Sequence, residues 1–241
     1  MKIPFLKHFE LPSEKPNRGS LFRSTDLIFN EQFKNFSARF EYNVDLRGLK
    51  AVAVTSSIAG EGKTVSTVNL AMNLASTGRK KVLLVDFDLR KSDLARELRI
   101  TPLPGMVEYL GGSVSLGDTV RDGLAKGLHV IPSGTQVDAT WDLITGDKFR
   151  AFLKEIRDAY DVILLDTPPI IPVSDTLALR EVVDGFILVY RLGYTPHTLF
   201  RRAMEDIGVP KLLGVLLNGE EPESGRYYQR YYGKYYKKPE V

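Results

Sequence analysis

The chain has 241 residues, 43% of them hydrophobic and 26% charged, which is ordinary for a water-soluble globular protein with one sizeable domain. The sequence contains no run of about eighteen apolar residues that would predict a membrane span. It has no cysteine, which excludes disulfides and thiolate metal sites and fits a cytoplasmic protein. The net charge is +3, but residues 226–241 hold five of the 33 basic residues and one of the 30 acidic ones. The rest of the chain is close to neutral, so its charge gives no reason to expect nucleic-acid binding there.

The N-terminal part of the chain divides into an arm and a helix. Residues 1–25 are rich in Pro, Ser, Lys and Arg, lack the apolar core of a signal peptide, and are expected to form a flexible arm. In DLIFNEQFKNFSARFEYNV, phenylalanines then recur at steps of four, three and four, the spacing of one helix face. We expect this stripe to cover the domain core, with a subunit contact as the alternative. Its members are Phe29, Phe33, Phe36 and Phe40.

From about residue 50 to residue 218, short apolar runs alternate with helical patterns. The runs are AVAVT, KVLLVD, LHVIPSG, DVILLD, GFILVY and LLGVLLN. Because their apolarity is continuous, they predict strands buried on both faces. The expected fold class is α/β, a doubly wound and mostly parallel sheet with helices on both faces. We expect one domain over residues 26–219, followed by a disordered tyrosine-rich tail over 220–241.

The sequence AGEGKT, directly after the first predicted strand, is the core of a Walker A phosphate loop. Its glycines let backbone N–H groups turn towards phosphate oxygens, and the following helix presents its N-terminus to the same charge. The full Walker A pattern has glycine at the position of Ser57. The alternative, a glycine turn that serves only packing, would leave Lys63 unexplained. Lys63 is expected to reach the β- and γ-phosphates, and Thr64 to bind Mg²⁺. The predicted nucleotide-binding residues of this loop are Ala59, Gly60, Glu61, Gly62, Lys63, Thr64 and Val65.

Acidic residues follow two further predicted strands. Asp166 ends VILLD, the Walker B arrangement, in which a carboxylate orders Mg²⁺. Asp86 ends VLLVD, with Asp88 and Arg90 just beyond. Ligands gather at the carboxyl ends of parallel strands, so we expect Asp86, Asp166 and the phosphate loop to share one cleft. A single aspartate at the end of a strand could equally be a helix N-cap. The two aspartates together with the phosphate loop favour a catalytic or metal-binding role.

The loop AGEGKT, the segments VDFDLRK and DVILLDTPP, and the terminal tyrosines, in this order, resemble the bacterial protein-tyrosine kinases over about residues 20–241. The resemblance implies an autokinase that uses ATP and Mg²⁺ to phosphorylate the tail of a neighbouring copy, and so regulates capsule or exopolysaccharide synthesis and export. Its implied partners are further copies in a ring, a membrane-embedded polysaccharide co-polymerase that activates it at the inner face of the cell membrane, and a tyrosine phosphatase. The implied substrate residues are Tyr227, Tyr228, Tyr231, Tyr232, Tyr235 and Tyr236.

In this interpretation, the transferred phosphoryl group is neutralised by Lys63 and by Mg²⁺. The expected metal-binding residues are Thr64, Asp86 and Asp166. Asp86 is the first candidate for accepting the tyrosine proton and Asp88 the second, so the expected catalytic residues are Lys63, Asp86 and Asp88.

Two further positions follow from the resemblance. Asn218 is expected to contact the adenine, with a plain strand-end polar residue as the alternative. The helix before the first strand departs from the family's Glu-x-x-Arg-x-x-Arg pattern, which holds the ring together. Here the three positions are Glu31, Lys34 and Ser37, and lysine lacks the bidentate fork of arginine.

Two other functions share part of this sequence pattern. A partitioning or division-site ATPase shares the Walker segments, but it carries a lysine where this chain has Ile58. A nucleotide-gated scaffold could use its basic aromatic tail to bind nucleic acid or an acidic membrane surface. Phosphates at about −1.5 to −2 each would reverse the positive charge of the tail. We hypothesise that this reversal releases a modified tail from the acidic cleft.

Overall fold

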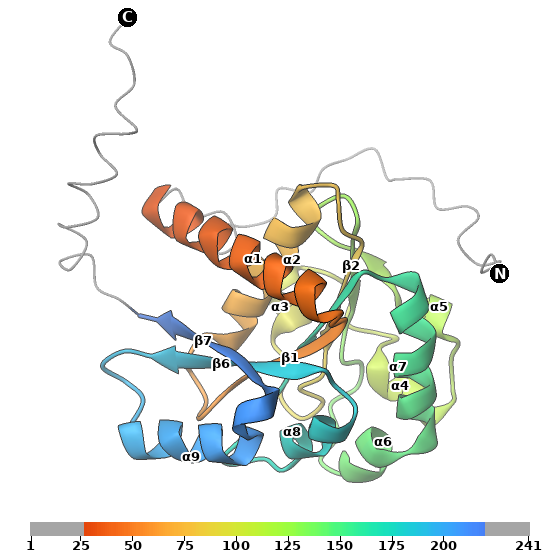
Figure 1. The fold of residues 1–241 in the computed structure, drawn as a ribbon. Coiled ribbons are helices and arrows are strands. Elements are labelled where there is room, and N and C mark those ends of the chain that lie inside the picture. The colour runs from red at the N-terminus through yellow and green to blue at the C-terminus, as the bar shows by residue number, and fades with distance from the viewer. Residues whose placement is uncertain (1–26, 220–241) are drawn as a thin grey trace, which may run out of the picture.

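The computed structural model describes residues 27–219, shown in colour in Figure 1. The predicted arm over 1–25 and the predicted tail over 220–241, with its six tyrosines, lie outside the described residues, so both stay predictions. None of the described helices is long and apolar enough to cross a membrane.

The described chain is built on a seven-stranded sheet with the strand order β3-β4-β2-β5-β1-β6-β7. Neighbouring strands run parallel except β3 and β4, which pair antiparallel. The six predicted strands are present and the expected fold class is confirmed; the additional strand is the two-residue β3. The strands are β1 (Ala51–Ser56), β2 (Val82–Asp86), β3 (Arg121–Asp122), β4 (Leu128–Ile131), β5 (Val162–Asp166), β6 (Gly185–Arg191) and β7 (Leu212–Asn218).

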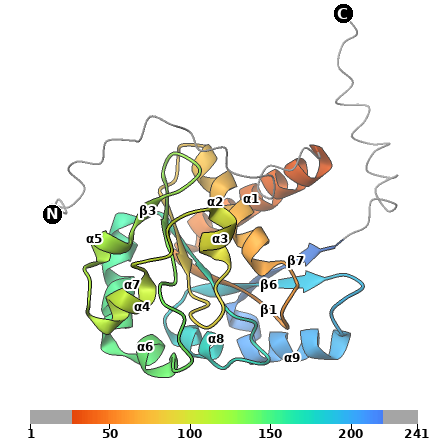
Figure 2. The same cartoon turned by 180° about the vertical axis from the view of Figure 1, so that it is seen from behind.

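Helices cover both faces of this sheet. On one side lie α1 (Leu27–Arg47), α2 (Lys63–Ser76) and α3 (Leu94–Leu98); on the other lie α4 (Met106–Gly111), α5 (Leu116–Thr119), α6 (Trp141–Thr145), α7 (Asp147–Ala159), α8 (Asp175–Ala178) and α9 (His197–Ile207). Figure 1 shows α1 and α2 above the strands and α9 below them, and Figure 2 shows α4, α5 and α6 from behind, close to α7. Short 3₁₀ helices, η2 (Leu179–Glu181) and η3 (Val209–Lys211), precede β6 and β7.

The sheet separates two hydrophobic clusters, and alternate residues of a central strand enter opposite ones. In β1, Ala51 and Ala53 belong to the cluster under α7 and α9, whereas Val52 and Val54 belong to the cluster under α1 and α2. Side chains alternate across a strand, so a strand with both faces buried must be apolar at every position. This burial explains why the strands read as continuous apolar runs.

The phenylalanine stripe of α1 lies along the helix as a chain of ring contacts. Successive rings are 4.8, 6.4 and 6.5 Å apart from Phe29 to Phe40. Phe40 is buried and Phe36 packs against the same cluster, so the expected core contact is confirmed for this half of the stripe. Glu31 pairs with Lys34 at 2.6 Å on the exposed side.

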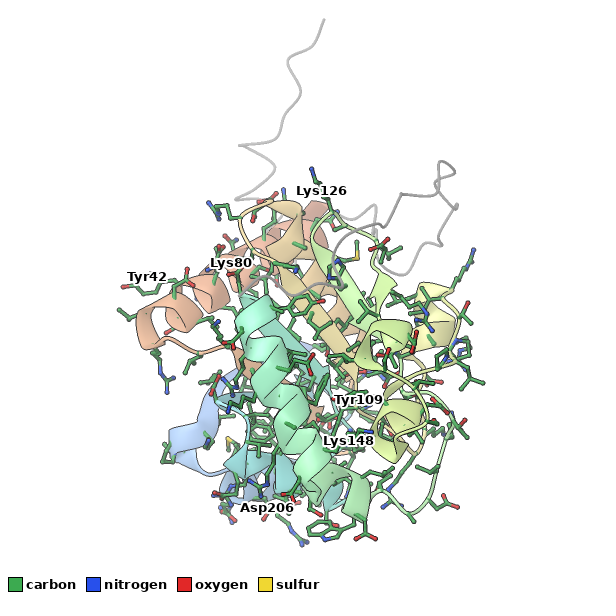
Figure 3. The ribbon with its side chains drawn as sticks, turned by 90° about the vertical axis from the view of Figure 1, so that its right-hand side faces the viewer. Tyr42, Lys80, Tyr109, Lys126, Lys148 and Asp206 are labelled. Atoms are coloured by element: carbon green, nitrogen blue, oxygen red, sulfur yellow. The ribbon has the colours of Figure 1, made fainter. Side chains whose placement is uncertain are left out.

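On the other face of the sheet, a cation–aromatic contact joins α7 to α4. Figure 3 shows Lys148 of α7 beside Tyr109 of α4, with the ammonium nitrogen 5.1 Å from the ring centre. The Tyr109 ring also packs 5.7 Å from Phe152, another residue of α7. Contacts of this kind between a cation and an aromatic face contribute about 0.5–1 kcal/mol at exposed sites.

Candidate active site

The phosphate loop connects β1 to α2, and two of its glycines have left-handed backbones. Gly60 has φ of 83° and Gly62 has φ of 91°, a region that side chains rarely adopt. A Cβ on Gly62 would lie 2.2 Å from Nδ2 of Asn218. Helix α2 begins at Lys63, directly after the loop, so its unpaired N–H groups lie at the same end of the sheet. The loop therefore has the backbone form that anion binding requires.

The carboxylate of Glu61 lies inside the loop rather than in solvent. Its side chain is fully buried, and Oε2 accepts the backbone N–H of Ile58 at 2.6 Å. Its other oxygen accepts the hydroxyl of Thr195, from the segment after β6. The side chain of Glu61 thus fixes the shape of the loop, which leaves its backbone N–H as the group available to a phosphate.

Asp86 and Asp166 end adjacent strands and are paired in register. Both are buried, with 1% of their surface exposed. Burial, followed by the nearby Asp166, raises the pKa of Asp86 well above its usual range, against a hydrogen bond donated by Ser92. Burial also raises the pKa of Asp166, although Lys63 and the hydroxyls of Thr64 and Thr67 oppose the rise. Two buried carboxyl groups thus meet where the loop ends.

Lys63 is the cation that faces these carboxylates. Its ammonium nitrogen lies 3.4 Å from Oδ2 of Asp88, whose Oδ1 accepts the backbone N–H of Lys91 at 3.0 Å. Burial would lower the pKa of Lys63, but the charges of Asp166, Asp88 and Asp86 outweigh it and the pKa is raised. Lys63 is therefore charged at neutral pH.

The charge balance of this group fits a divalent cation. The carboxyls of Asp86, Asp88 and Asp166 are all nearly buried, and Lys63 is the cation that interacts with all three. If all three were ionised, their negative charge would exceed the single positive charge of Lys63, and a divalent cation would neutralise the surplus; oxygen ligands are those that Mg²⁺ prefers. Within residues 27–219 no three Asp, Glu or His side chains are arranged as a complete metal site. Mg²⁺ here would take the rest of its ligands from a hydroxyl such as that of Thr64, from water and from phosphate.

The segment that follows β2 is held from the side by Arg90. Its Nε donates to Oδ2 of Asp175 at 3.0 Å, and its Nη2 donates to the hydroxyl of Thr140 at 2.8 Å. The Thr140 hydroxyl in turn donates to Asp175 at 2.5 Å. Asp175 and Thr140 are buried, so this network anchors the segment that also carries Asp88 to the start of α8.

The structure brings the predicted residues of the body together at the carboxyl end of the central strands. Asn218 ends β7, and its Nδ2 donates to the carbonyl of Glu61 at 2.8 Å, so it touches the phosphate loop; its contact with adenine stays a prediction. Further residues, which no sequence motif identifies, support the site through hydrogen bonds from other segments: Thr67, Ser92, Thr140, Asp175, Arg191, Tyr194 and Thr195. The only signal for them was their position after predicted strands or in the first turns of a helix.

Comparison with known proteins places this arrangement among characterised folds. Residues 49–194 match the family model described as an AAA domain. The chain is 33% identical over 228 residues to the tyrosine-protein kinase YwqD of Bacillus subtilis, covering 91% of this chain and 95% of YwqD. It is 30% identical to the succinoglycan biosynthesis transport protein ExoP of Rhizobium meliloti, covering 86% of this chain but 28% of that much longer protein.

Solved structures agree with the sequence relatives. The kinase domain of VpsO superposes with a TM-score of 0.72 at 31% identity, covering 80% of this chain and 97% of that domain. The septum site-determining protein MinD of Pyrococcus horikoshii superposes with a TM-score of 0.58 at 24% identity, covering 74% of this chain and 76% of MinD. At that identity, the likeness to MinD concerns the fold alone.

Proposed function

The chain belongs to the bacterial tyrosine-protein kinases, and from this premise we propose that it transfers the γ-phosphoryl group of Mg²⁺·ATP to tail tyrosines of a neighbouring copy. The observation that carries the proposal is the group formed by Lys63, Asp86, Asp88 and Asp166 beside a glycine loop. Phosphoryl transfer depends mainly on positioning and on neutralising charge, and this group offers both.

The loop and Lys63 would bind the nucleotide. Backbone N–H groups of residues 60–64 would receive the β-phosphate, and Lys63 would lie against the transferred group. Thr64, Asp86 and Asp166 would hold Mg²⁺, which, when bound, supplies further neutralisation of phosphate charge. Asn218, whose Nδ2 donates to the carbonyl of Glu61, would contact the adenine.

Asp86 is the preferred acceptor of the tyrosine proton. A phenol has a pKa near 10, so the attacking oxygen must lose its proton during transfer. Burial and Asp166 raise the pKa of Asp86, which makes its carboxylate a stronger base. Asp88 is the second candidate, since its Oδ2 is already engaged with Lys63.

The three carboxyls of Asp86, Asp88 and Asp166 also suggest how substrate and product are distinguished. The unmodified tail carries five basic residues and one acidic residue over 226–241, so the carboxylates would attract it. Phosphates at about −1.5 to −2 each would reverse this attraction and release the tail. Changing the tail's Lys and Arg residues to Gln should then slow autophosphorylation most at low ionic strength, where charges are least screened.

The biological setting is proposed from the relatives. The likeness to ExoP, named as a succinoglycan biosynthesis transport protein, supports a role in exopolysaccharide or capsule synthesis and export. We expect the kinase to act in the cytoplasm at the inner face of the membrane, bound to a membrane-embedded polysaccharide co-polymerase and reset by a tyrosine phosphatase. We also expect a ring-like assembly of copies, within which the tail is phosphorylated in trans.

An in vitro phosphotyrosine assay with Mg²⁺·ATP tests the proposal. Three proteins are compared: the full chain, Lys63→Met, and a chain ending at Gly225, which lacks the six tail tyrosines. The full chain should become labelled, and Lys63→Met should not. The shortened chain should lose most of its label but should phosphorylate the intact tail of Lys63→Met when the two are mixed.

The outcomes distinguish a tyrosine kinase from a nucleotide-gated scaffold. If the full chain binds ATP but is not labelled, even with the cytoplasmic segment of the membrane partner present, a nucleotide-gated scaffold becomes the better account. If the shortened chain cannot label Lys63→Met, transfer in trans is wrong while the kinase assignment stands.

A further inference from the structure

Three consecutive carbonyl oxygens of the phosphate loop accept side-chain hydrogen bonds from outside the loop. The carbonyl of Ala59 accepts the hydroxyl of Tyr194 at 3.2 Å, and that of Gly60 accepts Nη1 of Arg191 at 3.0 Å. The next carbonyl, that of Glu61, accepts the amide of Asn218, as described above. We call Arg191, Tyr194 and Asn218 the carbonyl clamp.

The direction of these bonds bears on anion binding. In a trans peptide, the carbonyl of one residue and the N–H of the next point in opposite directions. Holding the carbonyls of Ala59, Gly60 and Glu61 outward therefore turns the following N–H groups, those of residues 60–62, to the opposite side. Those N–H groups belong to the loop segment that binds phosphate in this motif.

The clamp residues also support one another. The Arg191 guanidinium lies 4.9 Å from the centre of the Tyr194 ring. Tyr194 is 49% exposed, so its contact with the loop is made at the surface and not forced by burial. Gly219, where the chain leaves β7, lies next to the clamp residue Arg191. A Cβ on Gly219 would lie 3.0 Å from Cγ of Arg191, and its φ of 76° already disfavours a side chain.

We propose that Arg191 and Tyr194 are positioning residues that, together with Asn218, hold the phosphate loop in its anion-binding shape, and that the lack of a side chain at Gly219 leaves the space that Arg191 occupies in this clamp. The inference rests on the proposed function, because it assigns the loop to a nucleotide. Without the clamp, ADP must order the loop when it binds, and the cost of that ordering lowers affinity. The clamp touches the loop and not the reacting atoms, so its effect should appear in nucleotide affinity.

Calorimetric titration of the full chain with ADP and Mg²⁺ tests the clamp. Tyr194→Phe removes one hydrogen bond and keeps the ring, so the Kd should rise about three- to tenfold. Arg191→Met should raise it about tenfold or more, and Arg191→Lys, which can still donate to Gly60, should recover part of the loss. Gly219→Ala should raise the Kd as well, because the added methyl group displaces Arg191.

Matched controls separate positioning from general damage. Tyr42→Phe alters a tyrosine that Figure 3 shows on α1 and that is 66% exposed, and it should leave the Kd unchanged. Gly78→Ala carries the same backbone strain as Gly219→Ala, with φ of 69°, but its methyl group meets nothing within 4 Å. It should lower the unfolding temperature without changing the Kd.

The results are read against the unmodified chain. If that chain binds ADP and the Arg191 and Tyr194 variants bind it equally well, the clamp is wrong although the nucleotide site stands. An unchanged Kd in Gly219→Ala alone would overturn the role given to Gly219. If the full chain binds ADP but phosphorylates nothing, even with the cytoplasmic segment of the membrane partner present, the proposed function fails while the clamp can still be confirmed. A full chain that does not bind ADP overturns both.

Discussion

Asp86 and Asp166 occupy paired positions at the ends of adjacent parallel strands, and both carboxyl groups are buried. Burial, followed by repulsion from Asp166, raises the pKa of Asp86, so keeping both acids ionised beside Lys63 costs stability. Because these carboxyls have a higher pKa in the folded protein than in the unfolded chain, the free energy of unfolding is highest below the unfolded pKa. It falls as pH rises through the folded pKa. Without a cation, the pair should therefore destabilise the protein near neutral pH.

Replacing Asp86 with Asn should relieve this repulsion. In EDTA at pH 7.5, Asp86→Asn should unfold about 2–4 °C higher than the parent for each kcal/mol regained. The difference should shrink as pH falls, because the raised pKa of Asp86 lets the folded parent take up its proton at a higher pH than the unfolded chain does. Mg²⁺ should stabilise the variant less than the parent. Thermal unfolding between pH 4 and 8 measures both effects. Asp158→Asn, on an exposed position of α7, is the control, and an identical pH slope in parent and Asp86→Asn would contradict the prediction.

Arg90 is expected to affect turnover more than nucleotide affinity. Its guanidinium joins Asp175 and Thr140 and so fixes the segment carrying Asp88. Arg90→Lys keeps the charge but loses the bidentate fork, and kcat should fall about tenfold with little change in the KM for ATP.

Steady-state kinetics on single and double variants check this role. Thr140→Val should lower kcat less, and its effect should largely disappear in the presence of Arg90→Lys, because both act through one network. Arg96→Lys, an arginine with 72% of its side chain exposed, should leave kcat unchanged. Fully additive losses would show that Arg90 and Thr140 act independently.

Asp184 should contribute to stability above acidic pH. Burial would raise its pKa, but Arg157 and the backbone N–H groups of Lys50 and Ala51 outweigh burial and lower it. A lowered pKa means that this stability is present above the unfolded pKa and is lost as pH falls through the folded one. Asp184→Asn should lower the free energy of unfolding at pH 7 by about 1–3 kcal/mol.

Urea unfolding at two pH values measures this contribution. The difference between Asp184→Asn and the parent should be smaller at pH 3 than at pH 7, since the parent's carboxyl is then increasingly protonated. An equal difference at both pH values would mean that lost packing, and not charge, explains the effect.

Gly62→Ala should weaken nucleotide binding without unfolding the domain. The backbone at Gly62 is left-handed, and an added Cβ would lie 2.2 Å from Nδ2 of Asn218. The loop would have to change shape, so affinity for ADP should fall about tenfold or more, while the unfolding temperature falls by a few degrees. Calorimetric titration and thermal unfolding are compared with Gly78→Ala, which has the strain alone. Retained ADP affinity in Gly62→Ala would show that the loop tolerates a different backbone.

The strands could be predicted because their signal is local. Both faces of the central strands are buried, so each strand is a continuous apolar run regardless of its neighbours. Their order could not be predicted in this way, since β5 lies between β2 and β1 through crossovers that leave no local pattern. β3 was missed because two residues, Arg121 and Asp122, are too few to show a period.

In the candidate site too, residues within local motifs could be predicted and residues without a motif could not. Lys63, Asp86 and Asp166 follow strands within recognisable motifs, and the structure places them together. Arg191 and Tyr194 have no motif, and their contacts with the loop join positions more than 130 residues apart. Hydrogen bonds from side chains to distant carbonyls depend on tertiary structure, which a single sequence does not display.

The position of β1 at the centre of the sheet has a consequence for how the protein folds. Ala51 pairs with Ile163 on one side and Val52 pairs with Gly185 on the other. A chain synthesised from its N-terminus must therefore keep this apolar strand unpaired until about a hundred further residues have emerged. Contacts over such distances form slowly, so the nucleotide loop takes shape only near the end of folding. Nucleotide binding by a nascent chain would consequently report that the domain is complete.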